Sequence, residues 1–151
     1  MKRELEDKLK ADFPALFEDM HNPDLQGYSA MKFGCACEDG WYKIIRWASE
    51  QYKAWGEKHG IAIRFTQIKE KFGQLRMYWG FDMQPESSQW EELVEIDRQV
   101  SDKSDRACEF CGAESEQPYG RRASEGRYWI RTLCPTCREK DEKPKKEEAK
   151  A

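Results

Sequence analysis

Two cysteine pairs of identical spacing constrain most strongly what this chain can fold into. Cys108 and Cys111 form one C-x-x-C pair, and Cys134 and Cys137 form a second, with 22 residues between the pairs. A C-x-x-C turn places two sulfurs on one side of a tight loop, so two such turns supply the four corners of a tetrahedral metal site. The alternatives are two disulfides or a redox-active dithiol, and a lone redox dithiol would not require a second matching pair.

The cellular compartment bears on this choice. The first ten residues, MKRELEDKLK, are charged throughout and contain no apolar run of signal-peptide length. No segment approaches the roughly 18 apolar residues of a membrane span. We therefore expect a cytoplasmic protein without a membrane partner. In a reducing compartment, paired cysteines bind metal more often than they form disulfides.

We predict one structural Zn²⁺ in this protein, and iron in a similar four-sulfur site is the less common alternative. Four thiolates close the site and leave no coordination position for water or substrate, so the ion contributes folding energy and no chemistry. The predicted metal ligands are Cys108, Cys111, Cys134 and Cys137.

The composition agrees with a metal-stapled module, because only 38% of residues are hydrophobic and 36% are charged. Gly112 follows the first pair, where a positive φ is needed, and Pro135 stiffens the loop of the second. Residues 127–133 have strand character. We predict a zinc ribbon with both metal-binding turns on short β-hairpins.

The preceding sequence predicts helices flanking a hairpin. Apolar residues at spacings of three and four predict a helix over residues 2–20, kinked or divided at Pro14. A loop is expected over residues 21–34. A second helix is predicted over residues 40–58, with Asp39 as its N-cap and Gly60 at its carboxy-terminal end.

Alternating apolar residues after Gly60 predict a β-hairpin that turns at Phe72-Gly73. Ile68 falls out of phase with the first strand, which indicates a bulge or an early strand end. The fold class is therefore α+β. The expected organisation is a helix and hairpin body over residues 1–85, a connecting helix over 86–104, the zinc ribbon over 105–139 and a disordered charged tail over 140–151.

Three sequence blocks resemble a family of small proteins encoded by phages, prophages and plasmids. The blocks are CEDGWYKII at Cys37–Ile45, IKEKFGQLRMYW at Ile68–Trp79, and CEFCG with YWIRTLCPTC within Cys108–Cys137. The resemblance implies a helical and hairpin body with an appended zinc ribbon, a mobile-element origin and a bacterial host. It implies no particular reaction.

No catalytic constellation is evident, and we expect a protein that is not an enzyme. The chain has two histidines, neither placed in a nucleophile–base pattern. HNH nucleases also use paired zinc knuckles, but they require histidines that residues 112–133 lack. Cys35 and Cys37 are free thiols in the favoured interpretation. A second metal site completed by His21 and His59 is the alternative.

A host protein is the favoured partner, bound so as to inhibit host defence or transcription. Trp79, Phe81 and Trp90 are candidates for such a surface, although they also suit a core that has few aliphatic residues. Nucleic acid is the alternative partner, with arginines for phosphates and aromatic rings for bases. Against it, residues 105–139 contain six basic and six acidic residues. The candidate binding residues of the ribbon are Arg121, Arg122, Arg127, Tyr128, Trp129 and Arg131.

Overall fold

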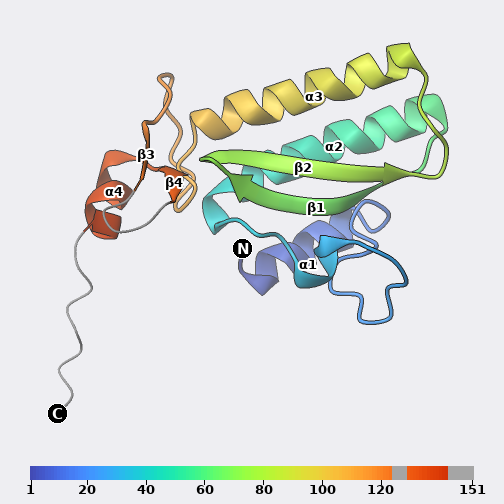
Figure 1. Ribbon diagram of the computed structural model, residues 1–151, viewed down its shortest axis with the longest axis horizontal. Helices are drawn as coiled ribbons and strands as arrows, with labels where there is room; N and C mark the ends of the chain where they lie inside the picture. The colour runs from blue at the N-terminus through green and yellow to red at the C-terminus, as the bar shows by residue number, and fades with distance from the viewer. Residues whose placement is uncertain (124–128, 143–151) are drawn as a thin grey trace.

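The computed structural model describes residues 1–123 and 129–142, and it confirms the α+β fold class (Figure 1). Two antiparallel two-stranded sheets are present, β1–β2 in the body and β3–β4 in the ribbon. The elements in chain order are α1 (Arg3–Asp12), η1 (Ala30–Phe33), η2 (Asp39–Trp41), α2 (Tyr42–His59), β1 (Ile63–Lys71), β2 (Gln74–Phe81), α3 (Ser87–Asp105), β3 (Arg121–Ala123), β4 (Ile130–Thr132) and α4 (Pro135–Glu142).

The β1–β2 hairpin is the centre of the body. Its two-residue turn has positive φ at both Phe72 (55°) and Gly73 (75°), the combination that matches the right-handed twist of the strands. The Gly73 N–H donates to Glu70 Oε1 at 2.7 Å. The predicted irregularity in the first strand is a bulge, since the register shifts between Phe65 and Gln67.

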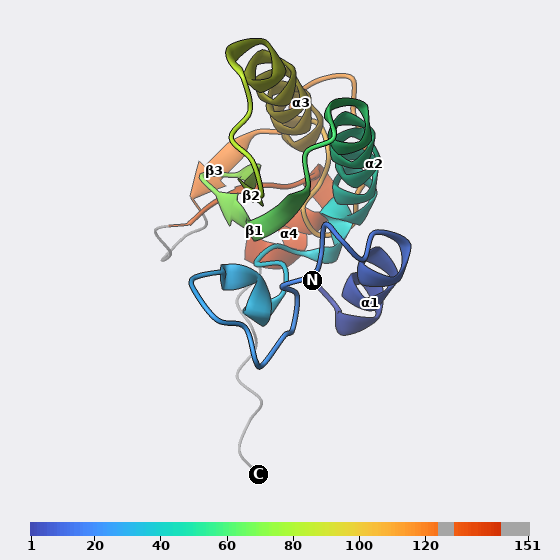
Figure 2. The ribbon, with the colours of Figure 1, turned by 90° about the vertical axis from the view of Figure 1, so that its right-hand side faces the viewer.

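Helices α2 and α3 cover one face of the hairpin, as Figure 2 shows. Their apolar residues and the inward residues of both strands form one core. Leu93 and Val100 of α3 are fully buried in this core, so α3 belongs to the body as well as leading to the ribbon. A capping box between Glu86 and Gln89 begins α3.

Both edges of the hairpin have hydrogen-bonding partners. Ala36 forms a parallel bridge with Lys69, and the Ala36 N–H donates to the Ile68 carbonyl at 2.9 Å. On the other edge, the Leu75 N–H donates to Ser104 Oγ of α3 at 3.2 Å. Each edge of the hairpin therefore has a hydrogen-bonding partner within the chain, and outward positions such as Arg64 and Tyr78 remain exposed.

Three local predictions need correction. The helix expected over residues 2–20 is interrupted near Pro14 as predicted, because proline disfavours helical geometry at the residue before it. The expected continuation is wrong, since α1 ends at Asp12 and residues 14–20 form turns. The apolar residues that follow, such as Phe17, are nevertheless buried. Asp39 does not cap α2, since its carboxylate accepts from the Lys2 N–H at 2.7 Å.

The carboxy-terminal tail was expected to begin at residue 140, yet α4 continues to Glu142. Residues 143–151 of that predicted tail lie outside the described residues. Gly60 does end α2 as predicted, in the left-handed conformation. None of the helices in the described ranges combines the length and the apolar character that a membrane crossing requires.

Candidate metal centre

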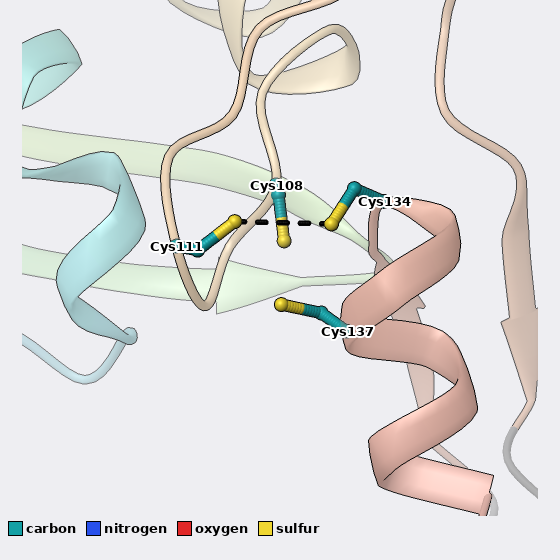
Figure 3. A group of neighbouring side chains, drawn as sticks. All are labelled: Cys108, Cys111, Cys134 and Cys137. Carbon is teal, nitrogen blue, oxygen red and sulfur yellow. Dashed lines mark hydrogen bonds between the residues drawn. The ribbon is translucent and has the colours of Figure 1, made fainter.

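The four predicted cysteine ligands meet at one point (Figure 3). Their sulfur atoms all lie within 4.8 Å of one another, and the Sγ atoms of Cys111 and Cys134 are 3.8 Å apart. Two sulfurs that each lie about 2.3 Å from one tetrahedral ion are separated by about this distance. Three of the four side chains are buried, and Cys111 is exposed. The arrangement can therefore bind one metal ion.

The first cysteine pair is built on a turn that depends on glycine. The Gly112 N–H donates to the Cys108 carbonyl at 2.8 Å, and the Cys108 N–H donates to the Ala113 carbonyl at 3.0 Å. Gly112 has a φ of 72°, which a side chain would strain. This turn has the geometry expected from the sequence.

The second cysteine pair differs from the prediction, because it lies at the start of a helix and not on a β-hairpin. Cys134 immediately precedes α4, and Pro135 is the first residue of that helix. The fixed φ of proline suits this position, where its missing N–H removes no helical hydrogen bond. A helix amino terminus also favours negatively charged sulfur, so this geometry suits a thiolate ligand.

Burial and hydrogen bonding shift the pKa values of Cys108, Cys134 and Cys137 in different directions. Burial raises the pKa of Cys108 and of Cys137. Burial also opposes ionisation of Cys134, but hydrogen bonds from the Cys137 backbone N–H and from neighbouring thiols lower the pKa of Cys134 overall. Four thiolates this close together repel one another, so a cation is needed to hold all of them deprotonated.

The ribbon is seated on the body through the backbone of Gly40 in η2. The Gly40 N–H donates to the Glu109 carbonyl, inside the first cysteine pair, at 2.8 Å. A Cβ atom on Gly40 would lie 2.2 Å from the Cys108 carbonyl oxygen, and one on Gly112 would lie 2.7 Å from the Gly40 oxygen. Two glycines thus let the metal-binding turn touch the body backbone directly.

Trp41 completes this contact. Its side chain is fully buried, and its indole N–H donates to the Ala107 carbonyl at 3.1 Å. The DGW segment therefore positions the residue directly before the first metal ligand. The sequence predicted Asp39 only as a helix cap, and it predicted no such contact for Trp41. The contact joins residues about 70 positions apart, so local patterns do not reveal it.

The ribbon also contacts the tip of the hairpin. Thr132 Oγ1 of β4 donates to the Gly73 carbonyl at 2.6 Å, and the Glu109 N–H donates to the Thr132 carbonyl at 2.9 Å. The indole N–H of Trp129 donates to Glu70 Oε2 at 2.7 Å. The metal-binding turn, the ribbon strand and the hairpin tip therefore form one connected set.

Two of the arginines predicted to bind nucleic acid on the ribbon, Arg121 and Arg131, have partners within the chain. Arg121 forms an ion pair with Asp105. The Arg131 guanidinium lies 4.8 Å from the ring centre of Phe110 and 5.9 Å from that of Trp129. Trp129 is exposed but donates to a carboxylate. Arg127 and Tyr128 lie outside the described residues, and Arg122 is described only as part of β3.

The alternative second metal site is not formed. Cys35 and Cys37 are buried in the body core, and burial raises the pKa of Cys35 to about 12. His21 Nε2 lies 2.6 Å from Glu6 Oε2, and the other histidine, His59, contacts Glu92. Within residues 1–123 and 129–142, the four ribbon cysteines are the one cluster of metal-ligating side chains.

Comparisons of this chain with known protein families, with curated proteins and with solved structures find no match.

Replacing Gly40 with alanine tests the seating of the ribbon. The added methyl group would collide with backbone atoms of the metal-binding turn, so we expect a loss of about 1–3 kcal/mol in the free energy of unfolding and faster metal release to a chelator. Gly80→Ala is the matched control, since its Cβ would meet Thr66 at an ordinary 3.4 Å. Equal melting temperatures and equal metal release for the two variants would contradict the contact.

Proposed function

We propose that this chain is a zinc-stabilised nucleic-acid-binding protein and not an enzyme. The four-thiolate site supports a structural ion, because four protein ligands complete a tetrahedron and leave no position for substrate. Sulfur ligands in tetrahedral arrangement favour Zn²⁺ over metals that prefer oxygen. The role of the ion is to hold the ribbon against Gly40 and the hairpin tip.

An uneven distribution of charge is the observation that favours nucleic acid as the partner. The chain has a net charge of −3, yet the β1–β2 hairpin carries four basic residues and one acidic residue. Helix α3 carries six acidic and two basic residues, which gives it a net charge of −4. A basic surface on an acidic protein favours a polyanionic partner bound at one place.

We define the open hairpin face as the outward side chains of the two strands. Because side chains alternate along a strand, the basic residues fall together on this face, opposite the core. Lys69 is paired in register with Arg76, and like charges placed directly opposite destabilise a hairpin. The residues of the face are Arg64, Gln67, Lys69, Lys71 and Tyr78. Gln74 and Arg76 alternate with the core positions as well, but their side chains reach α3, where Gln74 donates to Asp105 and Arg76 donates to Ser101.

Few carboxylates neutralise this face. Arg64 lies 3.5 Å from the buried Asp19 carboxylate, whereas the ion pairs of the described residues include neither Lys69 nor Lys71. The one acidic residue of the strands, Glu70, accepts hydrogen bonds from Gly73 and Trp129. Lys69 and Lys71 therefore remain available to phosphate groups.

A host-protein partner has weaker support in the geometry. Trp79, Phe81 and Trp90, the surface suggested for it, pack mainly against one another, with the Trp79 and Trp90 ring centres 5.5 Å apart. Trp79 and Phe81 are partly buried against the core, and Trp90 is 39% exposed. The mobile-element origin and the bacterial host stay predictions from the family resemblance.

Substitution of a metal ligand tests the structural role of zinc. Cys108→Ser and Cys137→Ser should each release the ion and unfold the ribbon, because three sulfurs no longer close the tetrahedron. Metal content per chain, measured by mass spectrometry beside circular dichroism, gives the result. Cys35→Ser is the control and should keep one zinc. One full equivalent of zinc in either ligand variant would refute the assignment.

Paired charge removal tests the binding of nucleic acid. Lys69→Gln with Lys71→Gln should weaken binding of a labelled 20-nucleotide strand. It should also reduce the magnitude of the slope of log affinity against log salt by about 1.4, because each phosphate contact to a single strand contributes about 0.7. Lys53→Gln with Lys58→Gln removes the same charge from α2 and should change neither quantity. Absence of binding by the wild-type protein at low salt, with capture of a host protein, would favour the other partner.

A further inference from the structure

Two large aromatic side chains lie exposed on the open hairpin face or at its turn, and two more lie on segments that contact the hairpin. Tyr78 is 41% exposed on the face itself, Phe72 is 67% exposed at the hairpin turn, and Trp129 lies at the tip through its bond to Glu70. Phe33, at the end of η1, is 78% exposed. Figure 2 shows η1 and β3 towards one side of the hairpin and α2 on the other.

Each of these rings has a cation close to it. Lys69 Nζ lies 5.3 Å from the ring centre of Tyr78, and Lys71 Nζ lies 5.7 Å from that of Phe72. The same pairing recurs at Phe33 with Lys32 and at Trp129 with Arg131. The surface therefore alternates flat apolar rings with positive charge, which is the pattern that binds bases and phosphates together.

This pattern distinguishes between two forms of nucleic acid. In a duplex the base faces are stacked on one another, so exposed rings on a protein gain nothing from them. A β-hairpin can enter the major groove of a duplex, but it then contacts the base edges through polar side chains. An unpaired strand offers base faces to the rings and phosphates to the lysines.

Resting on the proposed function, we propose that the open hairpin face binds single-stranded nucleic acid, with bases stacked on Tyr78 and Phe72 and phosphates bound by Lys69 and Lys71. The zinc ribbon holds Trp129 beside Glu70, so that an exposed ring lies next to the hairpin tip. The zinc ribbon thereby contributes to binding through a positioned aromatic side chain, while Arg121 and Arg131 are engaged within the chain.

Fluorescence anisotropy of the zinc-loaded full chain tests this proposal with three probes: a 20-nucleotide thymidine strand, a 20-nucleotide uridine strand and a mixed-sequence 20-base-pair duplex. We expect at least one single strand to bind about tenfold or more tightly than the duplex. Phe72→Leu with Tyr78→Leu keeps the charges and removes the π-faces, and it should lower single-strand affinity about tenfold or more. Tyr28→Leu, at a fully exposed ring elsewhere, is the matched control and should have no effect.

The outcomes separate this proposal from the proposed function. Equal affinity for strand and duplex, still dependent on Lys69 and Lys71, would overturn the single-strand proposal and leave phosphate binding in place. Binding to none of the probes at low salt would overturn both. If the paired leucine variant does not fold by circular dichroism, the ratio of single-strand to duplex affinity of the wild-type protein decides alone. Tighter binding of the thymidine strand identifies DNA as the bound nucleic acid, and tighter binding of the uridine strand identifies RNA.

Discussion

The direct backbone contact between Gly40 and the first metal-binding turn governs the arrangement of the whole molecule. The turn carries two of the four sulfur ligands, and the Glu109 carbonyl within it accepts a hydrogen bond from the Gly40 N–H. Neither glycine of the contact, Gly40 or Gly112, has room for a side chain. The metal site is therefore part of the body, and the order of the ribbon depends on coordination and on this contact together.

This arrangement explains how a small metal module supports a binding surface elsewhere. Once the turn is fixed, β4 lies against the hairpin tip through Thr132 and Gly73, and Trp129 lies beside Glu70. The hairpin itself is covered on one face, and Lys69 and Lys71, which form no ion pair among the described residues, lie on its other face. Like charges opposed at Lys69 and Arg76 cost stability. That cost is understandable if the surface binds a polyanion.

Features that depend on local chemistry were predictable from the sequence. Two C-x-x-C pairs, a Phe72-Gly73 turn and Gly60 at a helix end each reflect preferences of a few adjacent residues. Pro135 was misjudged because proline suits both a stiff loop and the first position of a helix. The seating on Gly40 joins distant residues and leaves no local pattern. The ribbon arginines also looked available, since only the fold brings Asp105 to Arg121.

Amide hydrogen exchange at Gly40, measured by nuclear magnetic resonance with and without zinc, tests the dependence of this seating on the metal most directly. The Gly40 N–H is hydrogen-bonded to the turn that carries two ligands, so chelation of zinc should abolish its protection. The Phe65 N–H, which donates to the Leu16 carbonyl within the body, should remain protected. Protection of Gly40 that persists after complete removal of the ion would contradict the account.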